Sequence, residues 1–340
     1  MRFRASVSHA AVAAVLLFGL GACAEVKQTL SDASAEIDSM MGSDEPAAPA
    51  AADEDAGGAV AGEAAYQAGL AARAAGRDSE ALQHFEDAGR QGHPGAAYEA
   101  GMAYTNGVGT EPDNDAAAEW FNKAAAAGEP RAQYLIGAAY YNGLGVERNY
   151  ETAVAYLGEA AVQGHADAQF LLAQAFANGN GVAKNRAWAT RWYGKAALQG
   201  HAAAQFHYGV SRASGLGLPA NPEAGYRWLL LAERNGQADA REVRDALAGK
   251  LSDAVRARAQ AWAEAFRPTQ NTGVGDTPTV MYVQFTLNGL GYDAGPVDGL
   301  IGPRTRSAVD SYRQARGLAG DGGIAPDLLR QLLADQGTLG

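Results

Sequence analysis

The chain has 340 residues, a formal net charge of −11 at pH 7 and a single cysteine. This length exceeds one compact core and predicts two or three structural units. The negative charge argues against nucleic acid as a partner, because such binding uses Lys and Arg to displace counterions from phosphates. Nine acidic residues and one lysine fall within residues 24–62, so most of the acidity belongs to one segment.

The N-terminus has the pattern of a targeting segment. Two arginines precede an apolar stretch, Ala10–Leu20, which is shorter than the roughly 20 residues that a membrane-spanning helix needs. The stretch ends in Leu20-Gly21-Ala22-Cys23, which resembles the lipobox of a bacterial lipoprotein signal. The resemblance implies that residues 1–22 are a signal peptide and that Cys23 is lipidated. Ala24 resembles the sorting pattern for an outer-membrane lipoprotein that faces the periplasm. The alternative is an ordinary signal peptide with a chance cysteine.

The segment after the cysteine is predicted to be a linker. Residues 42–62 are rich in Ala, Pro, Gly and acidic residues and have no hydrophobic period. Such a composition cannot bury a core and favours a disordered chain that repels itself. We therefore expect residues 23–62 to form a lipid anchor followed by an acidic Ala/Pro linker.

A 36-residue period dominates the middle of the chain. Self-similarity at such a period indicates a stack of repeated helical units. In the first full repeat we expect a helix over 96–106, a G-x-G turn, and a second helix over about 113–127. Small residues let the two helices approach closely, and the aromatic side chains fill the gaps between hairpins. The positions in phase are Gly92, Gly128, Gly164, Gly200 and Gly236; Ala96, Ala132, Ala168, Ala204 and Ala240; Gly107, Gly143, Gly179 and Gly215; Trp120, Tyr156, Trp192 and Trp228.

This pattern closely resembles the SEL-like repeat, a branch of the tetratricopeptide superfamily. The resemblance gives four repeats over 95–238. Residues 63–94 resemble a degenerate tetratricopeptide repeat that lacks four residues, which we place in its inter-helix turn. Residues 239–268 continue as a helical cap, with Trp262 and Phe266 available to cover the last hairpin. The resemblance implies a concave surface that binds a protein or a glycan.

Two further features of the repeats bear on their regularity and on metal binding. Arg212 and Pro219 break the pattern of the fourth repeat. His93, His165 and His201 occupy one repeat position, but equivalent positions of stacked repeats lie about 10 Å apart, too far for one zinc ion. We expect these histidines to be exposed turn residues, and we predict no metal site.

The C-terminal part carries a second motif. After a polar stretch at 269–277, which we interpret as a hinge, residues 278–335 contain Gln284-Phe285-Thr286-Leu287-Asn288-Gly289-Leu290-Gly291-Tyr292 and Gly295-Pro296-Val297-Asp298-Gly299-Leu300-Ile301-Gly302-Pro303-Arg304-Thr305. These segments closely resemble the peptidoglycan-binding domain type 1, a small three-helix module. Two departures from the family pattern are Tyr312-Arg313 and Gly323-Ile324-Ala325-Pro326-Asp327.

Most motif residues of this module are expected to be structural. Asp298-Gly299 is typical of a turn, and Thr305 is expected to cap a helix. An aromatic ring can stack on a sugar and an arginine can pair with a stem-peptide carboxylate. The peptidoglycan-contact candidates are Tyr292, Asp298, Arg304, Arg306 and Tyr312.

Together these features predict an all-α protein: a disordered, lipidated tail, a helix-hairpin solenoid and a three-helix module. We expect no enzyme and no cofactor, because repeats, cap and module account for every residue outside the tail. The favoured function is an envelope scaffold that binds peptidoglycan and an unknown envelope protein, with the membrane reached through the lipid anchor. One alternative is an adaptor or regulator of a cell-wall hydrolase, synthase, polar or secretion factor. Another is a surface-exposed lipoprotein that binds external proteins.

Overall fold

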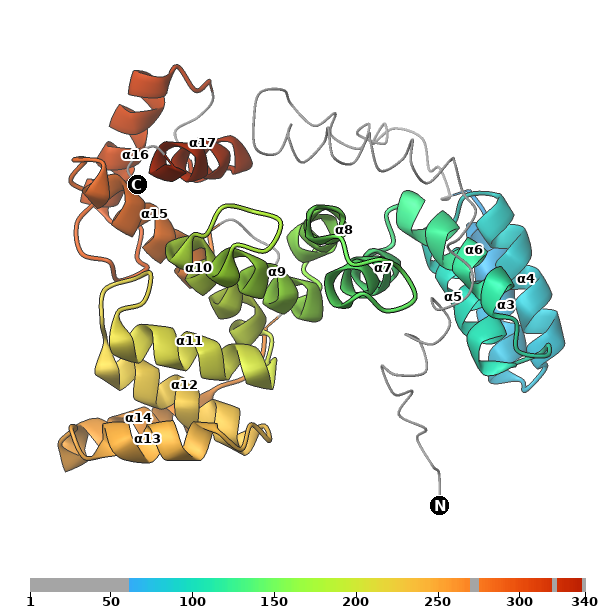
Figure 1. The fold of residues 1–340 in the computed structure, drawn as a ribbon, viewed down its shortest axis with the longest axis horizontal. Coiled ribbons are helices and arrows are strands. Elements are labelled where there is room, and N and C mark those ends of the chain that lie inside the picture. The colour runs from blue at the N-terminus through green and yellow to red at the C-terminus, as the bar shows by residue number, and fades with distance from the viewer. Residues whose placement is uncertain (1–60, 270–274, 320–322, 338–340) are drawn as a thin grey trace. The chain divides into compact units, whose positions relative to one another are not determined.

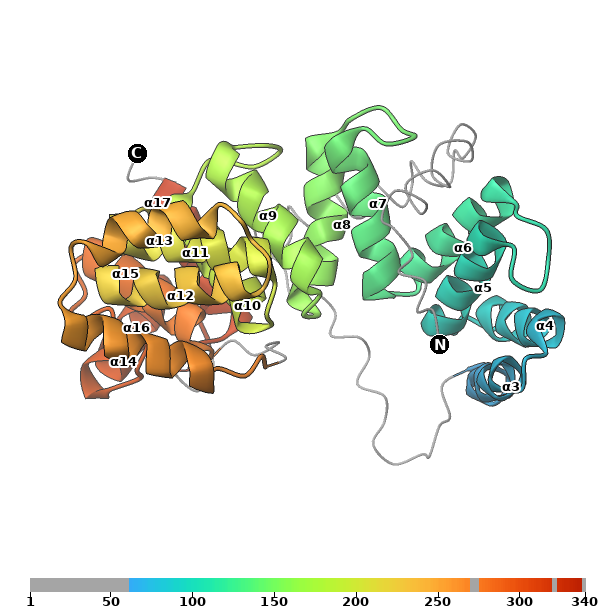
Figure 2. The same cartoon turned by 90° about the horizontal axis from the view of Figure 1, so that it is seen from below.

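The computed structural model describes residues 61–269, 275–319 and 323–337. Within these ranges the chain is all-helical, with no strand (Figures 1 and 2). Contacts divide the chain at Gln163 and Gly164 into two compact units. The predicted signal peptide, the lipidation at Cys23 and the acidic linker up to residue 60 lie outside the described residues. No helix of the described part is long and apolar enough to cross a membrane.

The first unit consists of three helix hairpins. In the hairpin of 63–94 three residues join the helices, whereas seven residues join them in the next hairpin. The four residues that this hairpin lacks are therefore missing from its inter-helix turn, as the sequence predicts. The helices are α3 (Glu63–Ala74), α4 (Asp78–Arg90), α5 (Pro94–Asn106), α6 (Asn114–Ala126), α7 (Pro130–Asn142) and α8 (Tyr150–Val162).

The G-x-G segments are turns, as expected. Gly107 ends α5 in the left-handed conformation, with φ 65°, and Gly109 has φ 78°. A Cβ atom on Gly109 would lie 2.4 Å from the carbonyl oxygen of Asp78. Glycine is required there both by the backbone conformation and by the close approach of the preceding hairpin.

The predicted aromatic positions form the core of each hairpin. Phe121 is fully buried and Trp120 is nearly so. A Cβ atom on Gly101 would lie 2.8 Å from the Phe121 ring, so the small residue is what lets α5 approach α6. In the four full repeats the second helix also starts from a side chain that accepts a backbone N–H, which supplies a partner for an otherwise unpaired donor. These N-cap residues are Asp113, Asn149, Asn185 and Asn221.

The three periodic histidines are helix caps, and the expectation that they are exposed is wrong for His93. Its Nδ1 accepts the N–H of Ala96 at 3.1 Å, and only 7% of the residue is exposed. His165 and His201 cap α9 (Ala166–Asn178) and α11 (Ala202–Ser214) in the same way. A capping nitrogen and a stacked ring explain the histidine: the His93 ring lies 4.2 Å from that of Tyr66.

Buried amide pairs close the open end of the hairpins. Gln199, after the second helix, donates to the side chain of Gln169 near the start of the first helix, at 2.9 Å. Asn235 donates to Gln205 at 2.8 Å in the next repeat. Gln169 and Gln205 are fully buried, so each amide needs such a partner.

The second unit holds two further repeats and the predicted cap. The cap is a helix hairpin, and Trp228 of the last repeat packs edge-on against Trp262 and Phe266, at 5.2 and 5.4 Å between ring centroids. The two aromatic residues therefore cover the last hairpin, as expected. Besides α9 and α11, the helices are α10 (Arg186–Leu198), α12 (Pro222–Arg234), α13 (Ala240–Ala248) and α14 (Asp253–Ala265).

The C-terminal module is a three-helix domain, as predicted. It is formed by α15 (Thr277–Gly289), α16 (Pro303–Arg316) and α17 (Pro326–Gly337). Its core side chains are fully buried, and Tyr282, Leu287, Tyr312, Leu328 and Leu332 belong to it.

Candidate functional site

The buried side-chain amide of Gln284 anchors the long loop between α15 and α16. The Oε1 atom of Gln284 accepts the backbone N–H groups of Asp298 and Gly299, at 3.1 and 2.9 Å. Its Nε2 donates to the carbonyl of Leu300 and to the hydroxyl of Thr305, at 3.0 and 3.1 Å. Gln284 is 1% exposed. It therefore fixes the Asp298-Gly299 turn, which the sequence predicts, and the residues that follow.

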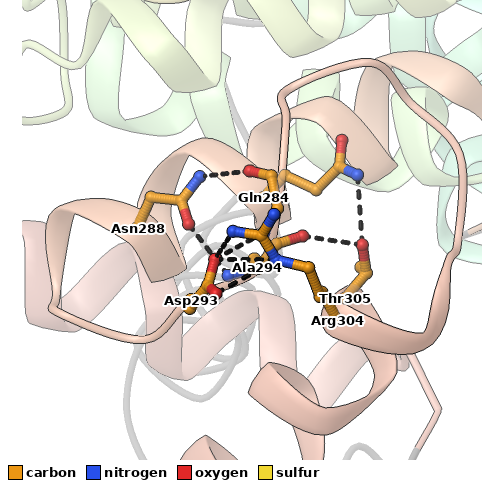
Figure 3. Close-up of polar contacts among 7 residues, drawn as sticks. Gln284, Asn288, Asp293, Ala294, Arg304 and Thr305 are labelled. Atoms are coloured by element: carbon orange, nitrogen blue, oxygen red, sulfur yellow. Dashed lines mark hydrogen bonds and ion pairs between the residues drawn. The ribbon is translucent and has the colours of Figure 1, made fainter.

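Thr305 has a different function from the predicted helix cap. The N-cap residue of α16 is Gly302, which has no side chain to cap the helix, and Thr305 lies within the first helical turn. Its buried hydroxyl donates to the carbonyl of Ala294 at 2.9 Å and accepts from Gln284 (Figure 3). Thr305 thus ties α16 to both halves of the loop.

The start of the loop is fixed by Asn288 and by an ion pair. Asn288 accepts the N–H of Ala294 at 2.9 Å and donates to the carbonyl of Gly295 at 2.8 Å. Arg304 pairs with Asp293, with Nε 3.0 Å from Oδ2 (Figure 3). The hydrogen bond from Arg304 lowers the pKa of Asp293. Both side chains are mostly exposed, so this pair contributes little to stability.

Four of the five predicted contact residues are at least partly exposed on this loop or at the start of α16. Asp298, Arg304 and Arg306 are exposed and Tyr292 is half-buried. Arg306 donates to the carbonyl of Ile301 at 3.0 Å. The prediction for Tyr312 is wrong, because its ring is fully buried, 5.4 Å from that of Tyr292, and its hydroxyl donates to Asp335. The family motif does not reveal which face of a helix a residue lies on.

The loop also exposes two apolar side chains that the sequence analysis did not select. Leu300 is 70% exposed and Ile301 is 43% exposed. The sequence did indicate their exposure, since two neighbouring aliphatic residues occur in a loop of Gly, Pro and Asp. We call Tyr292, Asp298, Leu300, Ile301, Arg304 and Arg306 the loop surface. It combines exposed apolar side chains with the guanidinium of Arg306 and with that of Arg304, which is paired with Asp293; this suits a ligand with a carboxylate and aliphatic or sugar groups.

The module is not free of the repeats, because α15 packs on α10 (Figure 1). Lys195 and Asp276 form an ion pair of 2.5 Å with side chains only 3% and 4% exposed. Burial lowers the pKa of Lys195, which the charge of Asp276 opposes. Asp276 also caps α15 by accepting the N–H of Thr279 at 2.9 Å. The pair therefore joins the start of the module to the third repeat.

Arg191 extends the same contact. Its guanidinium lies between two rings, 4.4 Å from Trp188 and 4.5 Å from Trp192, and its Nε donates to Thr279 at 2.9 Å. Complete burial lowers the pKa of Arg191 to about 10. Trp188 packs edge-on against Tyr282 of α15 at 4.7 Å. We call Trp188, Arg191, Lys195, Asp276, Thr279 and Tyr282 the docking contact.

The predicted hinge is tied to the repeats at both of its described ends. The N–H of Thr269 donates to the carbonyl of Leu198 at 3.0 Å, and Asp276 pairs with Lys195. Asn185 also donates to Gln336 of α17, at 2.8 Å. Contacts to the repeats therefore lie at both described ends of the predicted hinge; the hinge itself, whose residues 270–274 lie outside the described ranges, stays a prediction.

Nothing in the described ranges resembles a metal centre, since no group of three His, Cys, Asp or Glu residues there is placed to hold an ion. The groups that the site offers are arginines, a turn carboxylate and apolar side chains. They can bind and orient a ligand.

Comparison with known families agrees with this geometry. The Sel1 repeat model matches residues 94–129, 130–165, 166–201 and 202–237. The putative peptidoglycan binding domain model matches residues 276–332. The chain carries four Sel1 repeats and a C-terminal peptidoglycan-binding domain. Both are binding or repeat families rather than catalytic ones, and the second indicates a location in the cell envelope.

Solved structures similar to this chain are also Sel1 repeat proteins. A Sel1 repeat protein from Oxalobacter formigenes is 23% identical, with a TM-score of 0.48 over 62% of this chain and 87% of that one. The protein c5321, described as a protective antigen of uropathogenic Escherichia coli strains with an SLR fold, is also 23% identical. Its TM-score is 0.48 over 91% of this chain and 56% of that one. No curated protein matches significantly.

Proposed function

We propose that the protein is a non-enzymatic envelope scaffold that binds peptidoglycan through the loop surface and a protein partner through its repeats. The observation that carries the first part is the combination of exposed Arg306, Leu300 and Ile301 on a loop that Gln284 holds rigid. A fixed loop loses little conformational entropy on binding. The docking contact covers another part of the module, so the loop surface stays accessible while α15 is seated on α10.

The partner-binding part is supported by half-buried rings that occupy one repeat position on the first helices of the repeats. Tyr98 and Tyr134 hold this position in the first unit, and Phe170 and Phe206 hold it in the second. Aromatic side chains of this kind provide contact area at low entropic cost.

The lipid anchor completes the proposal. Acylation of Cys23 with two or three chains would hold the protein on the outer membrane permanently, since even one buried methylene contributes about 0.8 kcal/mol. Confined near the wall, the module acts at an effective concentration on the order of millimolar, so a modest affinity suffices. Cys23→Ser should move the protein from the membrane fraction to the soluble periplasmic fraction.

Sedimentation with purified peptidoglycan sacculi tests the wall-binding part. We expect the full chain to pellet, and the double variant Leu300→Ala/Ile301→Ala and the single variant Arg306→Ala to bind more weakly. Losing one charge-assisted hydrogen bond should weaken the affinity about tenfold. Arg258→Ala, an exposed arginine of α14, is the matched control. Equal sedimentation of all four proteins would contradict the proposal. Point variants are preferable to deletion of the module, because deletion would expose the buried groups of α10.

The accessibility of the protein on intact cells separates the periplasmic location from the cell surface. A periplasmic scaffold should resist protease added to whole cells and be cleaved after the outer membrane is permeabilised. Cleavage on intact cells would instead favour a surface-exposed lipoprotein.

A further inference from the structure

The first turn of α15 contacts both α10 and the loop between α15 and α16. Of residues 276–279, three contact α10 and Thr277 contacts the loop. The contacts with α10 are those of Asp276 with Lys195 at 2.5 Å, of Thr279 with Arg191 at 2.9 Å, and of the Pro278 ring with Gly194, where a Cβ atom would lie 2.7 Å from the ring. The start of this helix is thus shared by the third repeat and by the loop of the module.

Thr277 supports the loop at a glycine. A Cβ atom on Gly299 would lie 2.5 Å from Cγ2 of Thr277 and 3.1 Å from Cγ of Met281, so the backbone of the loop rests directly against both side chains. Gly299 is buried and has φ 82°, a conformation that favours glycine. The next residue is Leu300, the most exposed apolar side chain of the loop surface. The first two turns of α15 therefore fix the place of that side chain.

Met281 gives the loop a second connection to the repeats. The hydroxyl of Tyr208, on α11 of the fourth repeat, donates to the Sδ atom of Met281 at 3.8 Å. Both side chains are buried, and the Tyr208 ring packs edge-on against Trp228 at 5.3 Å. Met281 thus lies between the fourth repeat and Gly299.

The start of a helix needs such support, because its first N–H groups have no partner within the helix and its end turns fray. In α15 one carboxylate supplies the support: Oδ1 of Asp276 accepts the N–H of Thr279 at 2.9 Å, and Oδ2 pairs with Lys195 at 2.5 Å. The third repeat therefore holds the turn that carries Thr277. If this turn loosens, the loop gains conformational freedom that it must give up again on binding.

We propose that the third and fourth repeats belong to the wall-binding site, because they hold the start of α15 and thereby fix the loop surface. Gly194, Lys195 and Met281 are then positioning residues for the binding of peptidoglycan. The inference rests on the proposed function and adds a role for the repeats besides binding a protein partner. A module released from α10 keeps every residue of the loop surface and binds the wall more weakly.

Substitutions in α10 test the inference without changing the loop surface. Gly194→Ala places a methyl group against the Pro278 ring, and Lys195→Met removes the cation of the buried pair. In sedimentation with sacculi we expect each full-length variant to bind about threefold to tenfold more weakly than wild type, because a loosened loop must be ordered. Gly158→Ala and Lys123→Met are matched controls, since they make the same changes at the same positions of earlier repeats, and both should bind like wild type.

Hydrogen exchange shows whether the weaker binding arises in the loop. We expect the N–H groups of Thr279, at the start of α15, and of Gly299, in the loop, to exchange faster in both α10 variants. The N–H of buried Val309, in the middle of α16, should stay as protected as in wild type. Lost protection at Val309 would mean that the repeat holds the whole module together, and it would overturn the inference.

A rescue variant connects the affinity to the docking. Asp276→Asn added to Lys195→Met removes the unpaired charge and keeps an acceptor for the N–H of Thr279. We expect this double variant to recover part of the protection at Gly299 and part of the affinity for sacculi together. Recovered protection at Gly299 without recovered affinity would overturn the inference, because the loop would then be held with no effect on binding.

Two further outcomes separate this inference from the proposed function. If both α10 variants sediment as wild type does, or if the exchange of Thr279 and Gly299 is unchanged in both, the repeats do not position the loop. In either case sedimentation that still depends on Leu300, Ile301 and Arg306 leaves the proposed function intact. Failure of wild type to sediment would contradict the proposed function itself.

Discussion

Arg313 of α16 pairs with Asp327 of α17, with Nη2 2.7 Å from Oδ2 and Nη1 3.2 Å from Oδ1. Each residue belongs to one of the two segments in which the module departs from its family's usual pattern. Arg313 is 5% exposed, so its charge needs a partner. The pair therefore connects the two departing segments and joins the last two helices.

Removing one member of this pair should destabilise the module. Asp327→Asn leaves a buried guanidinium without its carboxylate, and we expect a loss of about 1–3 kcal/mol, less than for a fully buried pair because the Asp327 side chain is 32% exposed. Hydrogen exchange of the α16 and α17 amides measures the loss. Asp310→Asn, an exposed aspartate of α16, is the control. Unchanged protection would show that the pair is unimportant.

The same pair makes the stability of the module depend on pH. Burial raises the pKa of Asp327, but the hydrogen bonds from Arg313 and from the backbone of Leu328 outweigh it, and the pKa is lowered overall from 3.8. A carboxyl group with a lowered folded-state pKa stabilises the fold above its unfolded pKa, and this contribution is lost as pH falls through the folded value. The wild-type module should thus lose stability below about pH 4, and Asp327→Asn should lose less over the same range.

Two glycines one repeat apart test the docking contact. A Cβ atom on Gly194 would lie 2.7 Å from the Pro278 ring of α15, whereas a Cβ atom on Gly158 would meet nothing within 4 Å. Gly158→Ala should stabilise its helix by about 0.5–1 kcal/mol. Gly194→Ala gains the same helix propensity but must push α15 away. We expect faster proteolysis between α14 and α15 only in Gly194→Ala; equal cleavage of both variants would contradict the docked arrangement.

The buried ion pair should be replaceable as a pair but not singly. Lys195→Met alone leaves Asp276 buried without its cation and should cost about 3–5 kcal/mol of docking free energy. Lys195→Met with Asp276→Asn, whose side chain can still accept the N–H of Thr279 and cap α15, should restore part of it. The fluorescence of Trp188, which contacts Tyr282, and hydrogen exchange of α10 report the docking. Lys123→Met is the matched control, since Lys123 occupies the same repeat position in the first repeat and is exposed. A double variant as loosely docked as the single one would contradict the pairing.

The sequence predicted the repeats well because their signal is local and periodic. The glycine that ends a first helix and the aromatic residue that fills the hairpin recur every 36 residues in the sequence. The helix positions and the short turn of the first hairpin could therefore be predicted. The docking contact joins residues far apart in the chain, and a contact of this kind produces no periodic pattern in the sequence. One indication of the docking contact was present in the sequence: Trp188 occupies the position at which the other three repeats have Ala116, Thr152 and Ala224. Tyr312 was misassigned because a family motif does not separate the buried face of α16 from the exposed one.

The histidine cap offers the last test, since it separates a helix cap from an exposed turn. Asparagine is a strong N-cap residue and alanine is not. His93→Ala should therefore cost the first unit about 1 kcal/mol, and His93→Asn should recover much of this, apart from the stacking on Tyr66. The melting temperature of the full chain and hydrogen exchange at Ala96, whose N–H the ring accepts, measure both changes. His84→Ala, a more exposed histidine of α4, should change neither. If His93→Asn were as unstable as His93→Ala, then the ring's stacking on Tyr66 or the contact of its Nε2 with Glu63 at 3.0 Å, rather than its capping nitrogen, would hold the start of α5.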